Sequence, residues 1–291
     1  MVKFYMKKSL FILLSAIIST PMFAKLNVIV SIQPQMEFVK KIGGEHINTT
    51  LMVLPGKSPH TYEPKPQQMI EVSKADLYLA IGLEFENVWL PKFSSQNSTL
   101  KIIDISKDIN RSAMKSEHNH IHEEKHKKEN ALDPHIWVDP IHVKTIAKNI
   151  FEALSSVDKK NSDYYQKNLD TYIKELDKLD EEIKEILKEV PKDTKFMVFH
   201  PSWGYFAKRY SLKQIAIEVE GKTPKPKEII EILKEAKEEK IKAIFTQPEF
   251  SDKSARIISK ELKIEVFKTS HLAKEWSENL KNLAKAIAKS R

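Results

Sequence analysis

The chain has 291 residues, 30% of them charged, with a formal net charge of +8 and no cysteine. The lack of cysteine excludes disulfides and thiolate metal ligands. Lysines and glutamates are interleaved along helix-like stretches and do not cluster into one basic face, which indicates a solvated surface and argues against a nucleic-acid partner.

Residues 1–24 have the pattern of an export signal. Three lysines and no acidic residue precede the apolar run Leu10–Ile18, and the segment ends on the small residue Ala24. The run falls short of the about 20 apolar residues that a membrane-spanning helix needs, which favours a cleaved signal peptide over a retained anchor. Cleavage near Ala24 would remove the three lysines and lower the net charge from +8 to +5. Since no cysteine can carry a lipid anchor, we expect the mature protein in a bacterial periplasm.

Strand-like apolar runs alternate with helix-like stretches over the rest of the chain. The expected strands are Leu26–Ile32, Ile47–Leu54, Asp76–Gly82, Lys101–Ser106, Lys195–His200, Lys213–Val219, Ala243–Pro248 and Glu265–Ser270. Helical patterns are clearest at 34–42, 226–240, 252–262 and 275–289. Continuous apolar strands that alternate with helices are typical of parallel sheets covered on both faces. The predicted fold is α/β, with two lobes that each contain a parallel four-stranded sheet flanked by helices.

A rigid helical connector is expected between the lobes. Residues 141–190 contain neither glycine nor proline, and from Leu169 onward apolar residues recur every three or four positions, as on one helix face. One long helix over 161–190 would extend about 45 Å and limit how far the lobes can move. The predicted organisation is a signal peptide (1–24), an N-terminal lobe (25–140), the connector (141–190) and a C-terminal lobe (191–291).

A polar segment at 115–130 interrupts the N-terminal lobe. It contains one apolar residue, Ile121, and therefore predicts a surface loop that contributes nothing to a core. The segment is rich in histidines and glutamates, so it is either an adaptable chelate that gathers metal or only a solvated charged loop. Its histidines are His118, His120, His122 and His126.

Three other histidines stand in distinctive local settings. His60 lies in SPHTYEP after the second strand, His135 lies in DPHIWVDP between the two halves, and His200 ends the strand KFMVFH. Ligands of open parallel sheets bind beyond the carboxyl ends of the strands, so these residues are placed to meet in a cleft between the lobes. Three neutral imidazoles suit Zn²⁺ and leave one tetrahedral position open. We predict that His60, His135 and His200 bind Zn²⁺.

At these motifs the sequence resembles the periplasmic substrate-binding proteins of zinc and manganese ABC importers, the high-affinity zinc-uptake proteins in particular. The matching segments are SPHTYEPKPQQM (58–69), ALDPHIWVDP (131–140), VFHPSWGYFAKRY (198–210) and FTQPEFSDKSARIISKEL (245–262). The resemblance implies two α/β lobes joined by one long helix, with the metal between them. It also implies that zinc is a transported ligand, not a catalytic cofactor, and that an inner-membrane permease with its ATPase receives it. We expect the binding protein to be a monomer.

Two positions depart from that family. Ser270 stands where the family often has an acidic fourth ligand, and Gln247 stands where a glutamate is usual. Both changes remove anionic oxygen, which manganese favours and zinc does not need. A manganese- or iron-binding member of the family is the alternative. The candidates for the fourth ligand are water, Glu249, His271 and a histidine of the polar loop.

A zinc hydrolase is the alternative from another class, because three histidines with one open position also make a catalytic zinc site. Hydrolysis would further need a general base beside the metal. None of the three histidines belongs to an H-E-x-x-H arrangement, and Glu63 is better placed to orient His60 than to act as a base. We therefore predict a binding protein and no enzyme. The lack of a lipid-anchor cysteine also disfavours a surface adhesin.

Overall fold

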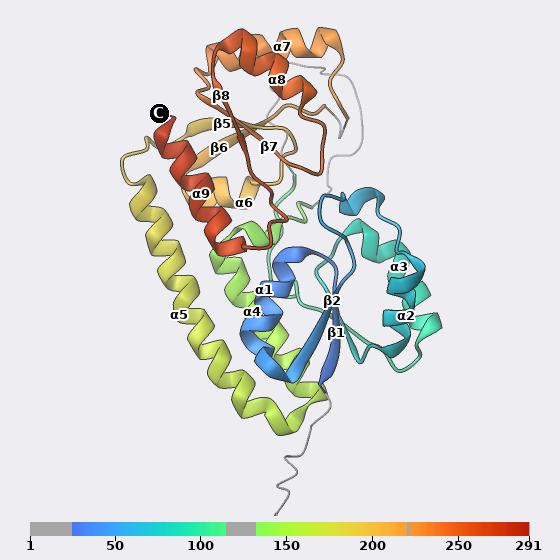
Figure 1. Cartoon of the computed structure of the whole chain (residues 1–291). Helices are drawn as coiled ribbons and strands as arrows, with labels where there is room; N and C mark the ends of the chain where they lie inside the picture. Colours follow the sequence, from blue (N-terminus) through green and yellow to red (C-terminus); the bar gives the residue numbers. More distant parts are fainter. Residues whose placement is uncertain (1–24, 115–131, 220–221, 291) are drawn as a thin grey trace, which may run out of the picture.

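The computed structural model describes residues 25–114, 132–219 and 222–290, which form two α/β lobes stacked along one long helix (Figure 1). The predicted signal peptide and the histidines of the polar loop lie outside the described residues. The strands are β1 (Leu26–Val30), β2 (Ile47–Leu51), β3 (Leu77–Ala80), β4 (Lys101–Asp104), β5 (Thr194–Val198), β6 (Leu212–Ala216), β7 (Ala243–Thr246) and β8 (Glu265–Lys268). The α-helices are α1 (Gln33–Gly43), α2 (Pro66–Lys74), α3 (Glu84–Gln96), α4 (Pro140–Val157), α5 (Ser162–Leu187), α6 (Gly204–Arg209), α7 (Pro226–Glu238), α8 (Lys253–Leu262) and α9 (Trp276–Lys289).

Each lobe is built on a parallel four-stranded sheet, and the two sheets share one topology. The strand orders are β2-β1-β3-β4 and β6-β5-β7-β8, and every pairing between neighbours is parallel. This confirms the predicted fold class. The eight expected strands all form, but each ends two or three residues earlier than predicted, so that β5 stops at Val198 and His200 lies in the loop beyond it. The first residue after each strand is buried, and after some strands, such as β3 and β6, it is apolar (Ile81 and Ile217) and extends the strand-like pattern.

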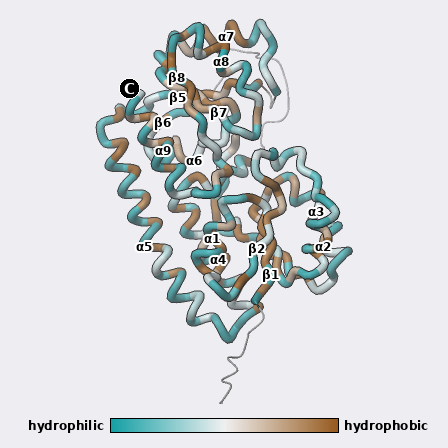
Figure 2. Tube along the Cα trace, viewed as in Figure 1, coloured by the Kyte–Doolittle hydropathy of each residue, from teal (hydrophilic) through white to brown (hydrophobic). Residues whose placement is uncertain are grey.

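Two helices make up the predicted connector. After α4, a short 3₁₀ turn (Lys159–Asn161) reverses the chain into α5, which has 26 residues and is therefore about 39 Å long. In Figure 1, α5 runs along one side of the molecule past both lobes. Leu169, Leu176 and Ile183 belong to the buried face of α5, as their spacing predicts. Figure 2 shows the matching pattern, since α5 carries both hydrophilic and hydrophobic residues along its length.

A single hydrophobic core crosses from one lobe into the other. It joins the N-terminal sheet to α1, α4, α5 and α9, and it takes in Phe196, Val198 and Phe245 on one face of the C-terminal sheet. A smaller core that includes Met197, Ile215 and Ile244 lies on the opposite face of that sheet. The C-terminal helix α9 packs against α5. At the start of α9, the backbone N of Trp276 and the hydroxyl of Ser277 both donate to the carboxylate of Glu37 on α1.

Within the part of the chain that the structure describes, no helix is both long and apolar enough to cross a membrane.

Candidate metal centre

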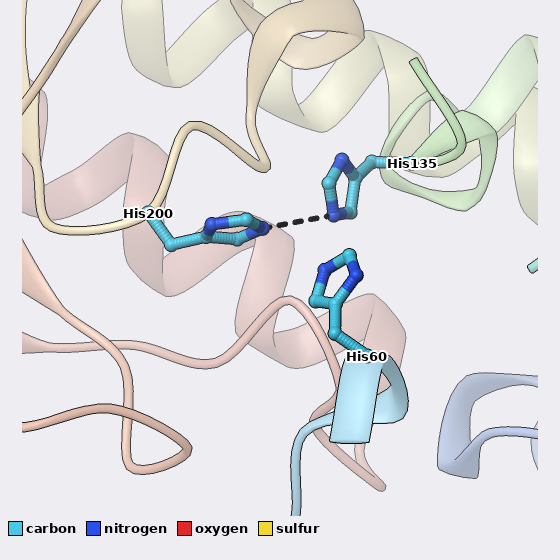
Figure 3. Close-up of side chains that lie close together, drawn as sticks. All are labelled: His60, His135 and His200. Carbon is cyan, nitrogen blue, oxygen red and sulfur yellow. Dashed lines mark hydrogen bonds between the residues drawn. The ribbon is translucent and has the colours of Figure 1, made fainter. Parts of the chain in front are cut away.

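The structure brings His60, His135 and His200 together between the lobes (Figure 3). His60 lies on the 3₁₀ helix η2 (Pro59–Thr61), His135 directly precedes the 3₁₀ helix η3 (Ile136–Val138), and His200 follows β5. One ring nitrogen of each residue lies within 4.8 Å of the corresponding atoms of the other two. Among residues 25–114, 132–219 and 222–290, this is the group of histidine and acidic side chains whose geometry suits a metal ion.

The closest approach in this group is between His135 and His200. Their Nε2 atoms are 3.3 Å apart, along the dashed line in Figure 3. Two nitrogens that bind one tetrahedral zinc ion at the usual Zn–N distance lie about 3.3 Å apart. Both rings are almost fully buried, at 2% and 5% exposure, so their positions are held by packing. These two imidazoles therefore already have the separation that a shared zinc ion requires.

Buried carboxylates orient both of these rings. Nδ1 of His135 lies 2.7 Å from Oδ1 of Asp133, and Nδ1 of His200 lies 2.9 Å from Oε1 of Glu218. Because an ionised carboxylate only accepts hydrogen bonds, each Nδ1 carries the proton and donates it. Each Nε2 of a neutral ring then has a bare lone pair, and the two nitrogens lie close enough for both lone pairs to reach one ion. This arrangement is unfavourable unless a cation lies between the rings, and it is the usual way in which proteins prepare histidines for a metal.

Packing around His200 keeps its ring neutral. The ring stacks on Phe250 with centroids 4.7 Å apart. Burial is the largest influence on the pKa of His200 and lowers it below the ordinary value, although the hydrogen bond to Glu218 acts in the opposite direction. Only the unprotonated nitrogen binds a metal, so a lowered pKa makes the ring a better ligand at neutral pH. Gln247 fixes the backbone of His200 from both sides, since its side chain donates to the carbonyl and accepts from the amide.

His60 is held less firmly than the other two histidines. Its side chain is 34% exposed, and its Nδ1 lies 3.3 Å from a carboxylate oxygen of Glu84, which is itself 78% exposed. Glu84, and not the nearby Glu63, is therefore the carboxylate that reaches His60. The backbone amide of His60 donates to the hydroxyl of Ser58, which caps the short helix. Of the three histidines, His60 has the most freedom to move toward an ion.

A fourth imidazole, His271, lies beside the group. It is 4% exposed, and its ring centroid is 5.1 Å from that of His135 and 5.8 Å from that of His200. Its Nδ1 is buried and has no hydrogen-bond partner among the described residues. Burial and then the neighbouring His135 and His200 hold the pKa of His271 well below its ordinary value. A buried polar atom without a partner costs about 1–3 kcal/mol of stability, so its presence here calls for an explanation.

The two positions that depart from the resembled family lie next to this centre. The hydroxyl of Ser270 donates to Oε1 of Glu249 at 2.6 Å. The second oxygen of Glu249 is buried and has no hydrogen-bond partner in the described part of the chain, and burial raises the pKa of this carboxyl group. Glu249 thus supplies a carboxyl group close to where Ser270 lacks one.

The orienting residues Asp133 and Glu218 were not identified from the sequence. Asp133 belongs to the DPHIWVDP motif and could have been found there, since it lies two residues before His135. Glu218 could be found only from the sheet register. Val198 pairs with Ala216 across β5 and β6, so His200 and Glu218 each lie two residues beyond the same pair.

Comparison with known proteins agrees with this architecture. A family model described as "ZnuA: Zinc-uptake complex component A periplasmic" matches residues 28–290. The "High-affinity zinc uptake system protein ZnuA" of Bacillus subtilis (strain 168) is 30% identical over 253 residues, which cover 84% of this chain and 78% of the relative. The "Manganese ABC transporter substrate-binding lipoprotein PsaA" of Streptococcus pneumoniae is 29% identical over 266 residues, covering 87% of this chain and 83% of the relative.

Solved structures give the same result. One titled "Crystal structure of ZnuA" has a TM-score of 0.84 and 39% sequence identity, and it covers 91% of this chain and 99% of that one. A second, titled "Crystal structure of 138-173 ZnuA deletion mutant plus zinc bound", has a TM-score of 0.83 at 39% identity, with coverage of 91% and 98%.

The fold and the site together define a class of protein in which two α/β lobes share a long helix and imidazoles converge between the lobes. Within that class, the chain belongs to the family of periplasmic zinc-uptake component A proteins.

Proposed function

We propose that this chain is the zinc-binding component of an ABC importer, which captures Zn²⁺ in the periplasm and delivers it to a membrane permease and its ATPase. Zinc is the cargo of this protein. His60, His135 and His200 are the proposed ligands. The observation that carries the proposal is the pair of buried Nε2 atoms 3.3 Å apart, each with its Nδ1 held by a carboxylate.

The charges around the centre favour a divalent cation. Asp133 and Glu218 are buried, at 5% and 7% exposure, and both contact ligand imidazoles. Their two negative charges match the charge of Zn²⁺ without taking a coordination position. Neutral imidazoles as the direct ligands suit zinc, whereas manganese prefers carboxylate oxygen. We therefore propose zinc over manganese or iron, although a relative of similar identity is named as a manganese protein.

We propose that the protein binds its metal without catalysing a reaction. The two carboxylates nearest the proposed ligands orient the rings, and the carboxyl group of Glu249 is engaged by Ser270. The two carboxylates that orient the rings are therefore not free to act as general bases. Incubation of the zinc-loaded protein with model esters tests this point, and metal-dependent turnover would support a hydrolase instead.

We also propose that the protein acts as a monomer in the periplasm. One chain supplies all three proposed ligands, so the site needs no second copy. The family description names a periplasmic protein, and the N-terminal pattern agrees with export and cleavage near Ala24. Mass spectrometry of protein recovered from the periplasm tests the cleavage site, and light scattering tests the oligomeric state.

The decisive experiment is metal analysis followed by titration. Protein purified from the periplasm should contain zinc at one ion per chain, and zinc should displace manganese in a competition titration. Protein that carries manganese, and that zinc fails to displace, would contradict the proposed cargo. The domain division at 25–140, 141–190 and 191–291 remains a prediction, which limited proteolysis can test.

A further inference from the structure

His271 lies in the loop between β8 and α9, next to His135 and His200. Its backbone carbonyl accepts a hydrogen bond from the indole Nε1 of Trp137 at 2.8 Å, which anchors the main chain at this point. Its side chain has no such anchor, because Nδ1 has no partner among the described residues. The ring is thus buried with an unpartnered nitrogen, beside the rings of His135 and Trp137.

The ring of His271 has the spacing of a co-ligand from two of the three proposed ligands. At the usual Zn–N distance and tetrahedral angles, the centroids of two imidazoles that share a zinc ion lie about 5 Å apart. The observed centroid distances are 5.1 Å for His135–His200, 5.5 Å for His60–His200, 5.1 Å for His135–His271 and 5.8 Å for His200–His271. His271 therefore stands at nearly the distance of a ligand from two members of the group.

The competing group is Glu249. One oxygen of its carboxyl group accepts the hydroxyl of Ser270 at 2.6 Å, and the group lies near enough to His200 to interact with it electrostatically. No hydrogen bond joins Glu249 to the three histidines among the described residues, whereas the ring of His271 contacts the rings of two of them. The geometry favours the imidazole.

We infer that His271 is the fourth metal ligand, so that the loaded protein holds Zn²⁺ with four imidazoles and no direct oxygen ligand. This inference rests on the proposed function. The ligand nitrogens of the other three histidines form a set within 4.8 Å that does not include His271. Its ring therefore turns inward on binding while Trp137 holds the backbone.

A four-imidazole site explains how this chain selects its metal. Ser270 and Gln247 have removed the anionic oxygens expected at these positions, and His271 supplies nitrogen in their place. An all-nitrogen tetrahedral set suits zinc and disfavours manganese, which prefers oxygen ligands. His271 is thus a specificity-determining residue as well as a ligand.

The first test needs no substitution. X-ray absorption of the zinc-loaded wild-type chain counts the imidazoles around the metal through their characteristic outer-shell scattering. Four imidazoles support the inference, and three imidazoles with an oxygen ligand overturn it. The visible spectrum of the cobalt-loaded chain provides the same distinction between a site closed by protein ligands and a site open to solvent.

The second test compares variants in a zinc titration. His271→Ala should weaken zinc binding by at least about 10–100-fold, since the loss of even a hydrogen-bond partner behind a ligand costs that much. Added imidazole should restore the wild-type cobalt spectrum by filling the vacated position. Glu249→Gln should weaken binding far less than His271→Ala, and the reverse order would assign the position to Glu249.

The outcomes separate this inference from the proposed function. If His271→Ala binds zinc as tightly as the wild type while His200→Ala does not, the fourth-ligand inference is wrong and the proposed function stands. If the wild type itself fails to bind zinc, the proposed function is wrong. Thermal unfolding in chelator shows whether the variant is folded, and His271→Asn serves as a second variant if His271→Ala is not.

Discussion

The indole Nε1 of Trp276 donates a hydrogen bond of 2.8 Å to the backbone carbonyl of Trp137. Trp137 in turn donates to the carbonyl of His271, also at 2.8 Å. Both indoles are at most 1% exposed and belong to the core that crosses between the lobes. The segment that carries His135 and the segment that carries His271 are therefore bonded to each other inside a shared core.

This bonding predicts that metal binding moves the lobes very little. Large closure would have to break both indole hydrogen bonds and separate α9 from α5. We expect nearly identical small-angle scattering with and without zinc, and local protection from hydrogen exchange around His60. A large decrease in the radius of gyration on adding zinc would contradict this prediction.

The substitution His200→Ala should remove most of the zinc affinity. His200 provides one of the two nitrogens already 3.3 Å apart, and we expect a loss greater than about 100-fold, the upper range for loss of a partner that only supports a ligand. Isothermal titration calorimetry measures this change. His46→Gln is the matched control, because His46 contacts Tyr164 away from the centre. An unchanged titration of His200→Ala would remove this residue from the site.

Glu218→Ala should weaken zinc binding although Glu218 is not a proposed ligand. Without its carboxylate, Nδ1 of His200 loses the acceptor that selects the tautomer, and we expect a loss of about 10–100-fold. Glu84→Ala is the matched comparison. It removes an exposed partner of His60, and exposed pairs of this kind contribute about 0–1 kcal/mol. Equal losses in the two variants would show that burial of the carboxylate is unimportant.

Protein freed of metal should lose stability as the pH falls below about 6.5, the ordinary pKa of histidine. Burial lowers the pKa of His200 and holds that of His271 well below the ordinary value in the folded protein. In this pH range the unfolded chain binds protons that the folded chain does not, so acid favours unfolding. Above the pKa that a histidine has in the unfolded chain, its contribution to the free energy of unfolding is complete. Below that pKa, the free energy of unfolding decreases by up to about 1.4 kcal/mol per pH unit for each such histidine.

Thermal unfolding between pH 7.5 and 5 in chelator measures this dependence. His271→Asn should show a shallower decrease than the wild type, because the neutral asparagine does not titrate. His142, whose pKa is also lowered by burial, remains in both proteins and contributes equally to both curves. Parallel curves for the wild type and the variant would contradict the assignment of the effect to His271.

Zinc should raise the unfolding temperature, and chelation should reverse the increase. A ligand present at 1,000 times its dissociation constant stabilises the folded state by about 4 kcal/mol if it binds only that state. Differential scanning calorimetry measures the shift, and the gain should nearly disappear in His200→Ala. Equal gains in both proteins would mean that zinc binds elsewhere.

Much of the fold was predictable because the spacing of apolar residues along the sequence indicates which face of each strand or helix is buried. All eight strands, α5 and the helices α1, α7, α8 and α9 follow from apolar spacing, with errors of a few residues at their ends. The reversal between α4 and α5 was missed, because the sequence there contains no glycine or proline to mark the turn at Lys159–Asn161. The role of α9 in contacting α1 through Glu37 was also missed, since it joins residues more than 200 positions apart.

The sequence by itself determined the parallel α/β class, the long helix and the three histidine motifs, because residue spacing and local motifs encode these features. Only the tertiary structure decided that His135 and His200 face each other and that Asp133 and Glu218 orient them. It also decided that the ring of His271 contacts both of these histidines. These relationships depend on strand order, on sheet register and on the path of loops between distant segments. The spacing of residues along the chain does not predict which distant side chains come into contact, because such contacts form only when the whole chain folds.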